Sequence, residues 1–165
     1  MSPNSSAPPA TKAVLPFAAY LPTPPPWDLR EEADAMSYDE FRSTYAVTSG
    51  PVRLGQWECT DAARPGRTLG PQARNYRATI AVGDHISTST AAASGPVAAL
   101  TAMLYDRGVA LELLKFHQVD SGDGIATFVC GSDGSADEWA MGLSEDPTQS
   151  ALRAMIACAN RLVSR

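Results

Sequence analysis

The two histidines of the chain, His85 and His117, are the side chains best suited to proton transfer near neutral pH, and they lie 32 positions apart. Neither belongs to an H-x-H or H-E-x-x-H pattern, and no cysteine cluster accompanies them, so we expect no metal site and no cofactor. Ser87, Ser89 and Ser94 lack the G-x-S-x-G pattern of a nucleophile elbow. These patterns favour a protein that binds a ligand over one that catalyses a reaction.

A run of small residues is the best candidate for a binding site. Ser94-Gly95-Pro96-Val97-Ala98 precedes an apolar segment of helical spacing, with proline in the position typical of a first helical turn. Free backbone N–H groups and the positive end of the helix dipole can receive a carboxylate there. The alternative is an ordinary corner between a strand and a helix, capped by Ser94.

Charge and composition exclude several partners. The formal net charge is -5, and Lys12 and Lys115 are the only lysines, so we expect neither nucleic acid nor a membrane surface as a partner. No apolar run approaches the ~18 residues that a membrane span needs. The three cysteines lie far apart, which favours reduced thiols and a cytoplasmic location.

Two similar segments show that the chain contains a duplicated unit. Residues 99–104 read ALTAML and residues 151–156 read ALRAMI, and a matching strand pattern precedes each of them at residues 78–83 and 126–131. One such unit cannot bury its apolar helix face alone, whereas two copies can cover one another. We therefore predict an α+β fold of two βββα units, related by a pseudo-twofold axis, with helices packed on antiparallel sheets.

Alternating apolar residues, turns and helix caps place the elements of each unit. We expect the following strands and helices: strands at about 52–60, 76–82 and 86–90, a helix at 95–107, strands at 109–118, 125–130 and 138–143, and a helix from Pro147 to Val163. Asp146 is the expected cap of the last helix, because it precedes Pro147 and stands three residues before Gln149.

The sequence before these units differs in composition, because eight of the thirteen prolines lie in the first 26 residues. We divide the chain into an extended Pro-rich tail (1–34), a short helical linker (35–50) and the duplicated domain (51–165, units 52–108 and 109–163). The linker helix begins at a capping box, Ser37 to Glu40. The tail is either a disordered leader or a strap held by apolar anchors, which would be Leu15, Phe17, Tyr20, Leu21 and Trp27.

The duplicated domain resembles the C-terminal regulatory domain of α-isopropylmalate synthases and the related citramalate synthases, over about residues 74–163. The resemblance rests on five short motifs in matching order: Ser94 to Ala99, where the family has G-x-G-P-x-x-A, Gly108-Val109, Leu113-Leu114, Trp139-x-x-Gly142, and Ser150-Ala151-Leu152-x-Ala154 through Asn160-Arg161. It implies a dimer of two-unit domains that binds leucine or isoleucine between units at the dimer interface and so inhibits a separate catalytic barrel.

The same resemblance implies the residues that contact the ligand, which are Ser94, Gly95, Pro96, Val97, Ala98, Leu114, Phe116, His117 and Ala126. Leucine-responsive members tend to carry D-Y-x-E-H where this chain has Lys115 to Val119. Lys115 and His117 would suit a more anionic ligand, such as a dicarboxylate, or Lys115 simply points to solvent from an edge strand. The catalytic barrel of the family is absent, so we do not expect the condensation reaction from this chain alone.

Three functions follow as hypotheses. The first is a non-catalytic homodimer that senses a branched-chain amino acid or 2-oxo acid, and that acts on a catalytic synthase subunit in trans. The second is an enzyme that uses the old effector pocket, with His117 as general base and the amides of Gly95 and Val97 holding an oxyanion. The third is a structural adaptor that dimerises and recruits a partner through the tail.

Overall fold

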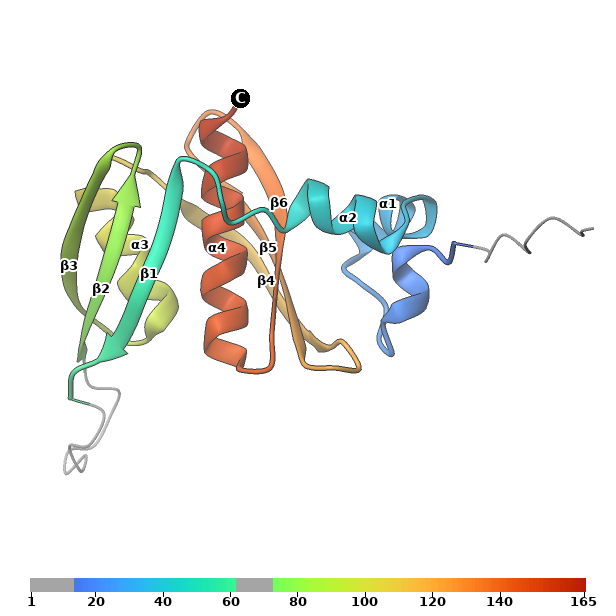
Figure 1. Cartoon of the computed structure of the whole chain (residues 1–165), viewed down its shortest axis with the longest axis horizontal. Helices are drawn as coiled ribbons and strands as arrows, with labels where there is room; N and C mark the ends of the chain where they lie inside the picture. The colour runs from blue at the N-terminus through green and yellow to red at the C-terminus, as the bar shows by residue number, and fades with distance from the viewer. Residues whose placement is uncertain (1–13, 62–72) are drawn as a thin grey trace, which may run out of the picture.

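The computed structural model describes residues 14–61 and 73–165, which form twelve helical and strand elements (Figure 1). The first half contains the short 3-10 helices η1 (Phe17–Tyr20) and η2 (Trp27–Leu29), the helices α1 (Arg30–Ala35) and α2 (Tyr38–Tyr45), the strands β1 (Val52–Cys59), β2 (Arg74–Val82) and β3 (His85–Ala93), and the helix α3 (Pro96–Asp106). The second half contains the strands β4 (Glu112–Asp120), β5 (Ile125–Ser132) and β6 (Asp137–Ser144) and the helix α4 (Pro147–Val163).

The strands form two separate antiparallel sheets, in the orders β1-β2-β3 and β4-β5-β6, and a helix follows each sheet. This confirms the predicted α+β fold and the repeated βββα order. Helix α4 packs on β5 and β6 and also contacts β1, so in Figure 1 it stands between the two sheets, whereas α3 packs on β3 and against α4. The division of the chain into three domains stays a prediction.

Local signals placed most boundaries to within two or three residues. The capping box forms as predicted, since the Ser37 side chain accepts from the Glu40 amide and the Glu40 carboxylate accepts from the Ser37 amide. The fourth strand begins at Glu112 and not at residue 109, because the amide of Val109 donates to the carbonyl of Leu104 (2.9 Å) and closes the end of α3. Gly108 allows that closure with its positive φ of 81°.

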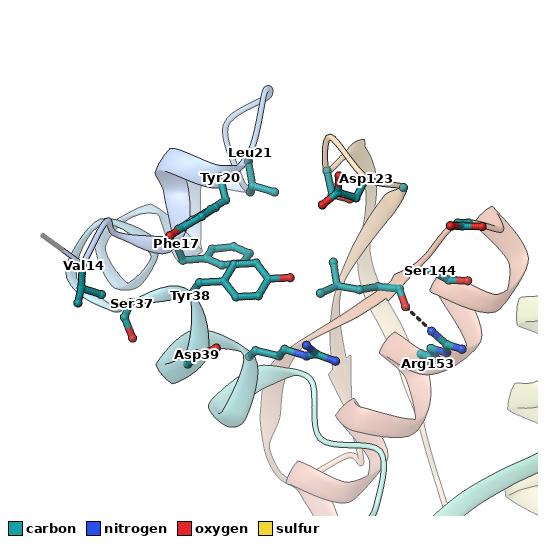
Figure 2. A pocket seen from close by; sticks show the side chains of 15 residues that line it. Val14, Phe17, Tyr20, Leu21, Ser37, Tyr38, Asp39, Asp123, Ser144 and Arg153 are labelled. Carbon is teal, nitrogen blue, oxygen red and sulfur yellow. Dashed lines mark hydrogen bonds between the residues drawn. The ribbon is translucent and has the colours of Figure 1, made fainter. Parts of the chain in front are cut away.

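The segment that was expected to be an extended tail is folded from residue 14 to the start of α2; its residues 1–13 lie outside the described part. Of the expected anchors, Phe17 is fully buried, while Tyr20 and Trp27 are exposed. Phe17 stacks on Phe41 with 4.0 Å between ring centroids, and both rings meet the edge of Phe128 on β5. We call residues 14–46 the N-terminal segment; it covers the face of the second sheet that points away from α4, and Figure 2 shows Phe17 and Tyr38 of this segment across a hollow from Asp123 and Arg153.

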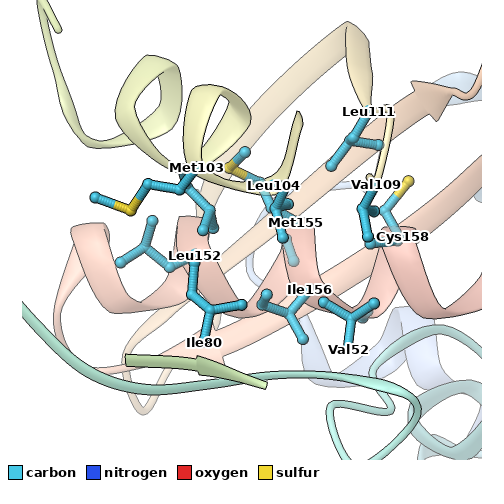
Figure 3. Close-up of a cluster of buried hydrophobic side chains, with 14 of the residues drawn as sticks. Val52, Ile80, Met103, Leu104, Val109, Leu111, Leu152, Met155, Ile156 and Cys158 are labelled. Atoms are coloured by element: carbon cyan, nitrogen blue, oxygen red, sulfur yellow. The ribbon is translucent and has the colours of Figure 1, made fainter. Parts of the chain in front are cut away.

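The main core joins the two units (Figure 3). It combines apolar residues of β1 and β2, the inner faces of α3 and α4, and the α4 side of β5 and β6. Its largest fully buried side chains are Ile80, Leu100, Met103, Leu104, Leu152, Met155 and Ile156. Side chains of both helices meet in this core, as expected for a duplicated unit.

Candidate functional site

The turn of small residues lies between β3 and α3, and its backbone geometry is suited to binding a negatively charged group. Gly95 is the N-cap residue and Pro96 occupies the first helical position, so Ser94 is not the cap. The amide of Ala99 is the first to donate within the helix, to the carbonyl of Gly95 (3.0 Å). The amides of Val97 and Ala98 come before it, and among the described residues no side chain caps them.

The second unit shows what completes such a helix start. At the same position of α4, the carboxylate of Asp146 accepts a hydrogen bond from the amide of Gln149 (3.0 Å), as the sequence predicted. Glycine replaces this aspartate in the first unit, at Gly95, where an added Cβ would meet nothing within 4 Å. One copy of the duplicated unit therefore supplies its own carboxylate, and the other leaves space for one.

The remaining predicted site residues lie on the second sheet and divide between its two faces. Phe116 pairs with Val129, and His117 pairs with Phe128, so their side chains point to opposite faces. His117 and the buried Ala126 share the face that the N-terminal segment covers, and the His117 ring lies 6.3 Å from that of Trp139. Phe116 is on the α4 side and 43% exposed. In the described part of the chain these residues belong to the second unit, whereas the turn belongs to the first.

Lys115 has a structural partner. Its Nζ donates to the Asp28 carboxylate (2.6 Å) and lies 5.7 Å from the centre of the Trp139 ring. The hydrogen bond and charge of Asp28 raise the pKa of Lys115 above its usual value. Lys115 therefore connects β4 to the N-terminal segment. The sequence pattern could not predict this ion pair, because its partners are 87 positions apart.

A hollow of about 810 Å³ lies between the N-terminal segment and the second unit (Figure 2). Phe17, Tyr20 and Tyr38 line one side of it, and Asp123, Ser144 and Arg153 line the other. None of the nine residues predicted to contact a ligand lines it. The sequence analysis missed this hollow because its walls come from the tail, the β4–β5 turn and the start of α4.

Two further features are absent from the described ranges, 14–61 and 73–165. No group of three or more His, Cys, Asp or Glu side chains is arranged to hold a metal ion. No helix there is both long enough and apolar enough to span a membrane.

Comparison with known proteins relates about half of the chain to part of one enzyme. No family model matches the sequence. The chain is 32% identical over 87 residues to the 2-isopropylmalate synthases of Clavibacter sepedonicus and of Clavibacter michiganensis subsp. michiganensis. Part of this chain is homologous to part of 2-isopropylmalate synthase. The match confirms the resemblance that the sequence motifs indicated.

The matched stretch covers 50% of this chain but only 15% of each synthase. The chain therefore spans a small part of the length of these relatives. The matched stretch corresponds to a domain-like fragment of 2-isopropylmalate synthase.

Proposed function

We propose that this chain is a dimerising regulatory domain that binds a small amino acid or 2-oxo acid and controls a catalytic synthase subunit in trans. The homology to a short part of 2-isopropylmalate synthase supports a functional relation to one part of that enzyme. The three cysteines, all free thiols, fit a reducing compartment and hence the cytoplasm.

The uncapped start of α3 is the observation that carries the ligand proposal. Asp146 shows that this fold places a carboxylate at the N-terminus of the equivalent helix α4. A ligand carboxylate at Gly95 would accept hydrogen bonds from the amides of Val97 and Ala98 and would interact favourably with the helix dipole.

Exposed apolar side chains support the dimer. On β4 and α3, Leu114, Phe116 and Tyr105 are 48%, 43% and 73% exposed. Among the described strands, β4 pairs with β5 alone and is an edge strand. If a second copy buried this surface, the ligand would lie between units of two chains. The predicted site residues, which lie on different units within one chain, would then be close together across the interface.

Light scattering tests the dimer. The native chain should have twice its monomer mass of 17.4 kDa, and Phe116→Asp should give the monomer because a carboxylate cannot be buried there without a partner. Ile86→Asp, on β3 and 68% exposed, is the matched control and should remain dimeric. A monomeric native chain, or a Phe116→Asp dimer, would contradict the proposed interface.

Calorimetric titration with leucine, isoleucine, valine and their 2-oxo acids tests the ligand site. Gly95→Asp should abolish binding without loss of stability, because its side chain would cap α3 as Asp146 caps α4. Gly95→Ala adds no carboxylate and should still bind, since nothing lies within 4 Å of its Cβ. Unchanged binding by Gly95→Asp would place the ligand elsewhere.

A further inference from the structure

The hollow beneath the N-terminal segment has an aromatic wall. The Tyr38 ring lies 5.6 Å from that of Phe17 and 5.1 Å from that of Tyr20, and Leu21 adds aliphatic surface beside them. On the opposite side Leu143 of β6 continues the apolar lining. Its volume of about 810 Å³ is within the range of small-molecule sites in proteins.

Two arginines line the same hollow. Arg42 comes from α2 of the N-terminal segment and Arg153 from α4. Within the described part of the chain, neither forms an ion pair with a carboxylate. One guanidinium N–H of Arg153 donates to the carbonyl of Leu143 (2.6 Å), which holds the group at the wall of the hollow (Figure 2).

Three carboxylates lie at the same hollow. They belong to Asp39 on α2, Asp123 in the β4–β5 turn and Glu145 before α4. With two guanidinium groups against three carboxylates, the lining disfavours a ligand of high negative charge. A ligand with one carboxylate and one ammonium group matches both signs of charge.

We propose that this hollow binds a zwitterionic amino acid with an aromatic side chain, at a site separate from the one proposed at Gly95. The ring of the ligand would lie against Tyr20 and Tyr38, and its carboxylate would pair with Arg42 and Arg153. The ammonium group would face Asp123 or Glu145. Such a ligand bridges the N-terminal segment and the second unit and so holds the segment in place.

Calorimetric titration of the full chain with L-phenylalanine, 3-phenylpropionate and 2-phenylethylamine tests this proposal, because the last two each lack one charge of the first. L-phenylalanine should bind, and each analogue should bind at least about tenfold more weakly, since each loses a charged hydrogen bond. Absence of L-phenylalanine binding at concentrations up to about 10 mM would overturn the proposal. It would mean that the dissociation constant is higher than about 1 mM. Equal affinity for all three compounds would also overturn it.

Variants locate the bound molecule. Arg42→Ala should weaken L-phenylalanine binding at least about tenfold by removing a charged partner. Arg77→Ala, on the other sheet, is the matched control and should leave binding unchanged. If Arg42→Ala unfolds, Arg153→Gln should show the same weakening. Unchanged affinity in Arg42→Ala or in Arg153→Gln would contradict this site.

The Gly95→Asp variant separates the two proposals. It should leave L-phenylalanine binding intact, because Gly95 is not among the residues that line the hollow. If Gly95→Asp instead abolishes L-phenylalanine binding, the ligand sits at the start of α3 and the hollow is not its site.

Discussion

Asn160 on α4 pairs with both backbone polar groups of Val52 at the start of β1. Its Oδ1 accepts from the Val52 amide (2.7 Å), and its Nδ2 donates to the Val52 carbonyl (2.9 Å). The two residues are 108 positions apart and both are buried. One side chain of the second unit thus satisfies both backbone polar groups of Val52 in the first strand of the first unit.

Replacing this amide should weaken the whole fold. Asn160→Leu keeps the approximate size but leaves the buried amide and carbonyl of Val52 without partners, which costs about 2–4 kcal/mol of unfolding free energy. Gln149→Ala, on the same helix, should change it by less than about 0.5 kcal/mol. Urea denaturation measures both, and equal stabilities would show that the pair contributes nothing.

The approach of α4 to β6 depends on Gly142. A Cβ there would overlap the backbone of α4 at Ser150 and Ala154, which a side-chain rotation cannot relieve. Gly142→Ala should therefore lower the unfolding free energy by about 3 kcal/mol or prevent folding. Gly95→Ala is the control glycine and should keep normal stability, and a Gly142→Ala protein as stable as this control would show that α4 moves away at little cost.

Phe17 should anchor the N-terminal segment. Phe17→Ala removes the stacked contact with Phe41 and the edge contact with Phe128, a loss typically of about 3–5 kcal/mol. Amide hydrogen exchange should then accelerate over residues 14–46, while α4 keeps its protection. Leu15→Ala, at a half-exposed position, is the matched control. Uniform acceleration through α4 would mean that the segment and the domain unfold as one unit.

Cys158 gives the fold a pH dependence on the alkaline side. Burial raises the pKa of its thiol from 9.0 to about 12, although a backbone hydrogen bond with Gly131 acts in the opposite direction. Between these pH values the folded chain holds a proton that the unfolded chain has lost, so this thiol should make stability fall as the pH rises from 9 towards 12. Denaturation midpoints should show a shallower slope in Cys158→Ser than in the native chain, and burial also raises the pKa values of Cys130 and Tyr76, so part of the slope should remain in the variant.

Thiol labelling independently tests the burial of Cys158. In the folded chain at about pH 8, the half-buried Cys59 should react with iodoacetamide, while Cys158 should stay unmodified because it is both buried and protonated. Mass spectrometry distinguishes the two peptides. Equal labelling would show that α4 opens easily.

Local sequence signals predicted the elements because their causes are local. The Ser37 and Asp146 caps, the proline at position 147 and the glycine turns each act within four residues. Of the two alternatives for the tail, the strap held by apolar anchors agrees with the buried Phe17, which contacts Phe128, 111 positions further along the chain. Proline density indicated an extended chain, and the docking surface that overrides it was not visible in the local pattern.

The sites divide in the same way. The turn at Gly95 could be predicted, since small residues before a helix are a local pattern with a known consequence. The hollow could not be predicted, because Arg42 and Arg153, which both line it, are 111 positions apart in the sequence. Only the folded N-terminal segment brings their walls together.

A thermal-shift titration of the native chain tests the central claim, that this is a domain that binds a small amino or oxo acid, most directly. At a hundredfold excess over its dissociation constant, leucine, isoleucine, valine or one of their 2-oxo acids should add about 2.7 kcal/mol of stability and raise the unfolding midpoint. A shift with one of these compounds that Gly95→Asp loses is the predicted result. No shift with any of them would contradict the proposed function.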